Sequence, residues 1–224
     1  MESIEVHGYA ILEGVLAPLD IYCIQEDVAS SSLLRSRAGA RHALHAPSVE
    51  ALARDTRLLG LAKLVLGPGA APFRATLFEK THSANWLVVW HQDTALPLCR
   101  RLDVPGWGPW SVKGGIVYAH APTSVLSRIL ALRIHLDDST ESNGPLRVLP
   151  GTHRLGVLGD DEVAQVASEM SPVDCIVRRG GVLAMRPLII HSSTKSRVDT
   201  PRRVLHIEYA ASEVPGDGLE LAVA

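Results

Sequence analysis

The period of the hydrophobic positions changes near residue 72 of the chain. After a short expected strand within residues 4–16, apolar residues recur at helical spacing and predict helices over 19–34 and 49–66, with Ser48 as N-cap of the second. Beyond residue 72, alternating or continuous apolar runs bounded by Gly, Pro and Asn predict strands instead. We expect these strands within residues 73–79, 85–93, 127–136, 143–153, 175–178, 182–190 and 203–211, with a loop over 97–115 and a short amphipathic helix within 156–170. Helices followed by many strands indicate an α+β chain, mainly β, whose strands form one barrel or jelly roll.

The stretch 85–93, NWLVVWHQD, begins as a buried strand and ends on polar side chains. His91 and Asp93 are two residues apart, so in a strand they project from the same face. An imidazole and a carboxylate at one spot are two of the three ligands of the 2-His-1-carboxylate site that holds non-haem Fe(II). Alone, the His-x-Asp pattern fits equally a strand end with two solvated side chains.

A third ligand has to come from elsewhere, and the chain has ten histidines. The stretch 188–193, LIIHSS, repeats the earlier pattern, because an apolar strand again ends on a histidine, His191, beside small polar residues. The weaker candidates are His120 in an expected loop, His135 and His206 inside strands, and His153 in a turn. A single histidine inside a strand is usually a hydrogen-bonded core residue. We therefore favour His191 as the partner of the first two residues.

Composition limits the number of domains, the kinds of partner and the cellular location to be expected. The chain has 224 residues, 46% of them hydrophobic and only 4% aromatic, which suffices for one core and predicts a single domain over 1–224. A net charge of −2 without a basic block predicts neither nucleic-acid nor membrane partners. Three widely spaced cysteines, no signal peptide and no apolar run of transmembrane length predict a soluble cytoplasmic protein.

Arg202 opens the last predicted strand, eleven residues after His191, where a fixed guanidinium can bind a carboxylate in bidentate fashion. With this arginine in place, the chain resembles the phytanoyl-CoA dioxygenase family of Fe(II)- and 2-oxoglutarate-dependent oxygenases. The resemblance runs from about Gly8 to Ala211. It rests on five motifs in order: NWLVVWHQD, LRIHLDD, NGPLRVLPGTH, LIIHSS and RRVLHIEY.

The resemblance implies a double-stranded β-helix, or jelly-roll, core with helices packed on one side. It makes His91, Asp93 and His191 the iron ligands and thus the catalytic residues. The expected reaction hydroxylates a C–H bond of a small molecule with O2, while 2-oxoglutarate becomes succinate and CO2. Ascorbate or another reductant is a further expected requirement. Because family halogenases lack the carboxylate ligand, Asp93 favours hydroxylation over halogenation.

The same resemblance assigns residues to the cosubstrate. Arg202 matches the arginine that binds the distal carboxylate of 2-oxoglutarate, and Ser193 is expected to hydrogen-bond that carboxylate. Trp110 matches, more loosely, an aromatic residue near the cosubstrate. One departure from the family pattern is Gly180-Gly181, where a Gly-Asp pair is usual.

Two other functions remain open from the sequence. A cupin-type metalloenzyme that needs no oxoacid would share the iron ligands but would not need Arg202. A non-catalytic module that binds a metal or small ligand would lack turnover. The loops expected to face the substrate, 31–47 and 94–125, contain no clustered basic patch of the kind that a CoA phosphate favours. A small or natural-product-like substrate is therefore preferred.

Alternation along the last strand predicts which of two neighbouring arginines faces the site. One face carries Arg202, Val204, His206 and Glu208, and the other carries Arg203, Leu205, Ile207 and Tyr209. The second face is apolar after its first member, so it is expected to pack against the helices and to leave Arg203 at the rim. The mixed face is expected to line the barrel interior.

Overall fold

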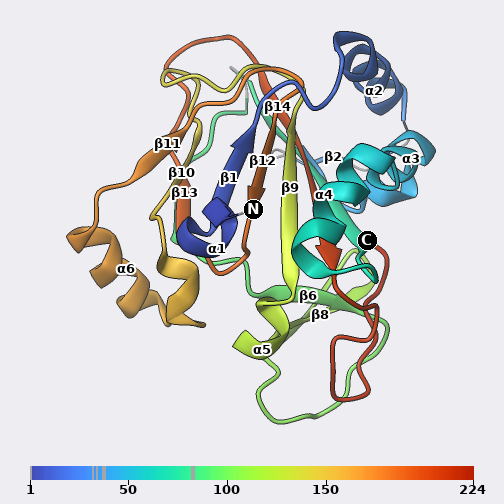
Figure 1. Ribbon diagram of the computed structural model, residues 1–224, viewed down its shortest axis with the longest axis vertical. Coiled ribbons are helices and arrows are strands. Elements are labelled where there is room, and N and C mark those ends of the chain that lie inside the picture. The colour runs from blue at the N-terminus through green and yellow to red at the C-terminus, as the bar shows by residue number, and fades with distance from the viewer. Residues whose placement is uncertain (1, 32, 34, 37–38, 82–83) are drawn as a thin grey trace.

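The computed structural model describes residues 2–31, 33, 35–36, 39–81 and 84–224. In this part of the chain the longest sheet has seven antiparallel strands (Figure 1). Their order is β1 (Tyr9–Leu12), β12 (Val182–Met185), β9 (Ile129–His135), β14 (Arg202–Ala210), β4 (Ala71–Lys80), β3 (Gly39–Ala40) and β2 (Arg35–Ser36). β14 lies between β9 and β4, so it occupies the middle of the sheet.

Three helices cover one face of this sheet, α2 (Pro18–Ser30), α3 (Pro47–Ala53) and α4 (Thr56–Leu66). Figure 1 shows them together beside β14 and β4. Their buried side chains, among them Ile21, Val49 and Leu58, pack against alternate residues of β9 and β14. The hydroxyl of Tyr209 also donates a hydrogen bond to the carbonyl of Ala53, 2.8 Å away. This contact confirms that the Arg203, Leu205, Ile207 and Tyr209 face of β14 meets the helices.

The other face of the seven-stranded sheet looks across a shared interior at a four-stranded sheet. Its strands are β11 (Val173–Cys175), β10 (Leu146–Val148), β13 (His191–Ser193) and β5 (Val88–His91). Buried side chains from both sheets, such as Leu183 and Val148, form an apolar cluster that fills part of this interior. Two facing antiparallel sheets with one filled interior are the arrangement of a jelly roll. The polar side chains of β4, β9 and β14 that point inward lie in the part of the interior that this cluster does not fill.

A third sheet extends the barrel, and smaller elements complete the fold. Its strands are β6 (Ala95–Leu98), β8 (Ile116–His120) and β7 (Trp110–Lys113). The remaining elements are α1 (Glu2–His7), η1 (Ala43–His45), α5 (Thr123–Leu126), η2 (Thr152–Leu155) and α6 (Asp160–Glu169). No helix in the described ranges is long and apolar enough to cross a membrane.

Some sequence predictions were wrong in their boundaries. The helix expected over 49–66 is two helices, because the chain breaks at Asp55, whose side chain accepts the Arg57 N–H and caps α4. Ser48 caps neither, since Pro47 opens α3. The loop expected over 97–115 holds β7 and part of β6.

The remaining corrections concern element ends. The expected strand 182–190 stops at Met185, and the strand within 85–93 spans only Val88–His91. The helix expected over 19–34 ends at Ser30, and residues 32 and 34 lie outside the described residues. The helix α1 and the end of β8 on His120 were also missed. The apolar runs thus predict where elements lie better than where they end.

Candidate metal centre

Strand register brings two histidines from distant parts of the chain together. β5 and β13 are antiparallel neighbours, and His91 pairs directly with His191 across them. Their imidazole rings lie with centroids 4.2 Å apart. Side chains directly opposite each other on adjacent strands project from the same face of the sheet. Both imidazoles therefore point into the barrel interior.

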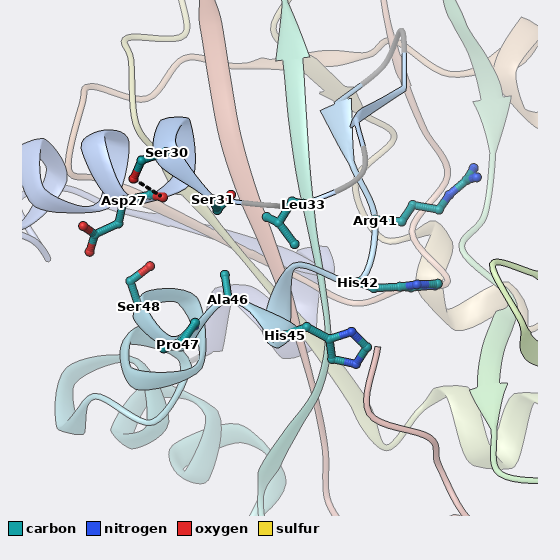
Figure 2. Close-up of a pocket in the computed structure, with 10 residues that line it drawn as sticks. All are labelled: Asp27, Ser30, Ser31, Leu33, Arg41, His42, His45, Ala46, Pro47 and Ser48. Atoms are coloured by element: carbon teal, nitrogen blue, oxygen red, sulfur yellow. Dashed lines mark hydrogen bonds between the residues drawn. The ribbon is translucent and has the colours of Figure 1, made fainter.

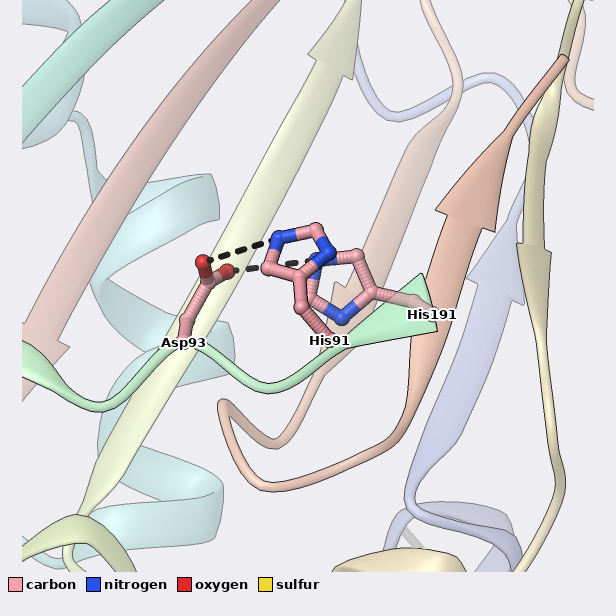
Figure 3. A group of neighbouring side chains, drawn as sticks. All are labelled: His91, Asp93 and His191. Carbon is pink, nitrogen blue, oxygen red and sulfur yellow. Dashed lines mark ion pairs between the residues drawn. The ribbon is translucent and has the colours of Figure 1, made fainter. Parts of the chain in front are cut away.

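Asp93 completes the group from the short segment between β5 and β6. Its backbone N–H donates to the carbonyl of Pro187 at 2.9 Å, which holds this segment against the one before β13. Its two carboxylate oxygens lie 3.6 Å from His91 Nε2 and 3.4 Å from His191 Nε2. Figure 3 shows the three side chains converging, and one ligand atom from each lies within 4.8 Å of the others. Two imidazole nitrogens and one carboxylate in this arrangement are able to hold one metal ion.

The two histidines are held in the same way by the backbone. His91 Nδ1 lies 2.9 Å from the carbonyl of Val89, and His191 Nδ1 lies 2.9 Å from the carbonyl of Ile189. A carbonyl oxygen only accepts, so each Nδ1 carries a proton and each Nε2 is the ring nitrogen that faces Asp93. Such a bond fixes the tautomer and the ring orientation of a metal-binding histidine.

Electrostatics keep the group ready to accept a cation. Burial lowers the pKa of His191 to about 4, although the carboxylate of Asp93 favours its protonated form. Burial alone would raise the pKa of Asp93, but His191 and His91 beside it hold that pKa well below its usual range. The carboxylate is therefore charged, and a cation between the three groups would satisfy it.

Next to the triad lies an inner cavity of about 100 Å³ that contains three buried cations. Lys80 ends β4, Arg133 lies in β9 and Arg202 opens β14, and they are 1%, 6% and 4% exposed. Lys80 and Arg202 are direct cross-strand partners. Burial lowers the pKa of Arg202 to about 9 and that of Lys80 to about 7, and repulsion from neighbouring guanidinium groups adds to both shifts. Buried charges of one sign need an anion beside them.

Hydrogen bonds in the inner cavity leave part of this charge unsatisfied. Lys80 Nζ donates to Ser193 Oγ at 2.6 Å and also to the carbonyl of Thr194. Within the described residues, no carboxylate pairs with Arg202 or Arg133, and the Nε atoms of both arginines have no hydrogen-bond partner. Arg133 Nη1 lies 2.9 Å from His206 Nδ1, and its guanidinium lies over the ring of Phe78. A small dianion in this cavity would accept hydrogen bonds from the donors that have no partner.

The predicted site residues are placed as follows. His91, Asp93, His191, Arg202 and Ser193 all line the inner cavity. Trp110 is not among the described residues that line it. That residue opens β7 and packs against the apolar cluster of the third sheet, with the Arg101 guanidinium over its ring. Its contact with a cosubstrate stays a prediction, as do the roles of the other five.

Sequence reasoning missed Lys80 and Arg133. Each is a polar residue that points into the barrel, on a strand whose opposite face is largely apolar and packs against the helices, as Arg202 does on β14. The period-two polar face shared by β4, β9 and β14 is the signal that marks them. Reading that face on three strands at once requires their order in the sheet, which the sequence does not provide.

A jelly-roll barrel with two imidazoles, one carboxylate and a cluster of buried cations in its interior is a candidate mononuclear metal protein. The chain belongs to the phytanoyl-CoA dioxygenase family, whose sequence model matches residues 4–204. The resemblance drawn from the five motifs is thus confirmed.

Relatives and solved structures agree with this family. The chain is 28% identical over 186 residues to an L-proline trans-4-hydroxylase of Streptomyces griseoviridis, covering 70% of this chain and 61% of that relative, less than two thirds of its length. It is 23% identical over 252 residues to an ectoine dioxygenase of Nocardia farcinica, and this match covers 95% of this chain and 77% of that relative. The crystal structure of AviO1 from Streptomyces viridochromogenes Tue57 matches with a TM-score of 0.68 and 26% identity, covering 93% of this chain and 92% of that one. The predicted fold class is confirmed by this likeness.

Proposed function

We propose that this protein is a non-haem Fe(II)- and 2-oxoglutarate-dependent dioxygenase that hydroxylates a C–H bond of a small molecule. Family membership and relatives named as a hydroxylase and a dioxygenase support this class. The observation that carries the proposal is the position of the triad beside three buried cations without a carboxylate partner among the described residues. A metal-binding module alone would not need that buried positive charge.

His91, Asp93 and His191 are the proposed ligands of one Fe(II). Three protein ligands leave coordination positions open for cosubstrate and O2. Bound iron would supply the oxidising chemistry, and the protein supplies ligand geometry and a shielded interior. Because the carboxylate of Asp93 occupies the third ligand position, no place is left there for a halide, which favours hydroxylation.

Arg202 is the proposed partner of the distal carboxylate of 2-oxoglutarate. Its side chain is buried, its Nε is unsatisfied, and a guanidinium binds a carboxylate through two parallel hydrogen bonds. Lys80 lines the same cavity, and after its bonds to Ser193 Oγ and the Thr194 carbonyl its ammonium keeps one N–H for this carboxylate. The Ser193 hydroxyl donates to the carbonyl of Gly144 at 2.9 Å, so it would have to turn from that carbonyl to donate to the oxoacid. The short cavity of about 100 Å³ suits a five-carbon diacid with its other end at the iron.

Other predictions from the sequence remain part of this proposal. They are one domain over 1–224, a cytoplasmic location, partners limited to a small substrate and O2, and ascorbate or another reductant as an aid to turnover. Neither a nucleic-acid nor a membrane partner is proposed.

Succinate release tests the proposal. Purified protein with Fe(II), 2-oxoglutarate and a reductant in air should form succinate slowly without any substrate, and a chelator should stop it. Oxoacid binding without succinate would favour the non-catalytic module. Iron binding without oxoacid binding would favour the oxoacid-independent metalloenzyme.

A further inference from the structure

A second cavity, of about 270 Å³, lies on the outer side of the triad. Asp93 and Phe78 line both cavities, so the two meet at the candidate metal centre. If the inner cavity holds the oxoacid, this outer cavity is where the substrate reaches the metal. Its charged side chains therefore report the chemistry of the substrate.

The acidic side chains of the outer cavity are already used. Both oxygens of Glu208 accept hydrogen bonds from Arg74, from its Nε and, at 2.6 Å, from Nη2, and Glu208 is only 1% exposed. Arg74 Nη1 donates to the carbonyl of Ala95 at 2.8 Å, so this pair is satisfied on both sides. Asp93 is the proposed metal ligand. A substrate ammonium group would find no free carboxylate among the described residues of this cavity.

The amide in the cavity wall is also occupied. Gln92 donates to the carbonyls of Gly156 and Leu188, both at 2.8 Å, and accepts the Leu158 N–H at 2.9 Å. These three bonds hold the side chain in the wall, and Gln92 brings no negative charge to a cationic ligand.

Two basic side chains of the same cavity have no anionic partner. Arg41 and Lys113 line it, and neither pairs with a carboxylate in the described part of the chain. Burial lowers the pKa of Lys113, and repulsion from Arg41 and Arg74 adds to the effect. Both residues are exposed and line the same cavity, so an anion that enters it can lie against both positive charges.

The two segments that carry Arg41 and Lys113 pack directly against each other. Gly114, at φ +57°, lies so close to His42 that a Cβ would come within 2.7 Å of the imidazole Cε1. His42 Nε2 lies 3.3 Å from the hydroxyl of Tyr118, and the ammonium of Lys113 lies 5.1 Å from the centre of the Tyr118 ring. These contacts join the turn between β7 and β8 to the segment that carries Arg41.

A separate surface pocket of about 540 Å³ between α2 and η1 offers the only alternative acid near Arg41 among its described lining residues, Asp27. Figure 2 shows the side chains of Arg41 and His42 extending away from Asp27 and Ser30 at the opposite end of that pocket. Arg41 is thus directed away from this carboxylate.

We infer that the substrate is a small molecule with an anionic group, a carboxylate or a phosphate, which Arg41 and Lys113 bind at the outer end of the cavity. This inference rests on the proposed function. It differs from recognition of a zwitterion, for whose ammonium group the described lining residues offer no free carboxylate. Charge-assisted hydrogen bonds to these two side chains would hold the anionic end while the carbon to be oxidised faces the metal.

Calorimetric titration tests this inference without turnover. Protein saturated with Fe(II) and 2-oxoglutarate, kept free of O2, is titrated with small aliphatic and aromatic monocarboxylic acids, with the primary amide of each, and with inorganic phosphate. We expect at least one acid, or phosphate, to bind, and the amide of that acid to bind roughly tenfold more weakly or worse. Tighter binding of phosphate than of any acid would assign the anionic group to a phosphate.

Charge-removing variants locate the binding site. Arg41→Gln and Lys113→Gln should each weaken binding of the responding anion roughly tenfold. Arg128→Gln removes an exposed arginine outside both cavities and should bind the anion as the unchanged protein does. Acids and amides that bind equally, no binding at all, or unchanged affinity in the Arg41 and Lys113 variants would overturn the inference. Succinate release without added acid reports separately on the proposed function.

Discussion

The inner and outer cavities both present cations near the triad, yet they are built differently. The inner cations, Lys80, Arg133 and Arg202, lie on three adjacent strands of the seven-stranded sheet, where backbone register fixes their positions. The outer cations Arg41 and Lys113 come from a segment before η1 and from a hairpin end. Rigid strands suit a cosubstrate that is the same throughout a family, whereas connecting segments can change with the substrate.

The largest expected effect is at the triad that both cavities share. Asp93→Ala should abolish iron binding and succinate release, since it removes the only carboxylate that faces His91 and His191 among the described residues. The fold should persist, because the barrel core is apolar. Metal analysis and a thermal melt check both expectations. Iron content equal to that of the unchanged protein would remove Asp93 from the ligand set.

The next effect sharpens the contrast within the inner cavity. Arg202→Ala should weaken 2-oxoglutarate binding well over tenfold while iron is kept, because loss of one partner of a desolvated charge pair costs about 2–5 kcal/mol. Arg202→Lys should also bind poorly, since an ammonium does not reproduce the planar fork. Calorimetry with the oxoacid measures both.

Arg203→Ala is the matched control. Arg203 is paired with Asp137 at 2.8 Å on the half-buried rim of the sheet, and loss of that bond should leave oxoacid affinity nearly unchanged. A larger loss of oxoacid affinity for Arg203→Ala than for Arg202→Ala would show that Arg203, and not Arg202, binds the cosubstrate.

A smaller effect concerns pH and the inner cavity. The pKa of Lys80 is lowered to about 7, so in the empty protein this group loses its proton as pH rises through 7. A bound dianion favours the charged form, so binding takes up a proton and 2-oxoglutarate affinity should fall above pH 7, by at most about tenfold per pH unit. In Lys80→Met this pH dependence should disappear, whereas Lys63→Met, on the exposed face of α4, should keep it. Equal slopes in Lys80→Met and the unchanged protein would contradict the role of Lys80.

The last effect concerns stability and lies outside both cavities. Burial lowers the pKa of His135 in β9 from 6.5 to about 3, so the unfolded chain binds this proton at higher pH than the folded protein does. Stability should therefore fall as pH falls from about 6.5 towards 3, with a slope of about 1.4 kcal/mol per pH unit for this proton. His135→Asn should reduce that slope by one proton in urea unfolding series. An unchanged slope would show that His135 is protonated in the folded state.

The two cavities also differ in how much of each could be predicted from the sequence. Apolar runs that end on His91 and His191 are local patterns, and alternation along β14 correctly separates Arg202 from Arg203. By contrast, Arg41 and Lys113 lie far apart in the sequence, the first before η1 and the second at the end of β7, and tertiary contacts such as Gly114 with His42 and His42 with Tyr118 bring them to one cavity. The break between α3 and α4 escaped prediction because the apolar spacing continues across the cap at Asp55.

The most direct test of the account is an absorption titration of the Fe(II)-loaded protein with 2-oxoglutarate in the absence of O2. A 2-oxo acid that binds Fe(II) through its keto oxygen gives a visible charge-transfer band. We predict that this band saturates at one oxoacid per chain, that Arg202→Ala needs well over ten times more oxoacid to reach it, and that Asp93→Ala never shows it. Full iron loading of the unchanged protein with no band at any oxoacid concentration would contradict the assignment of both the metal centre and the inner cavity.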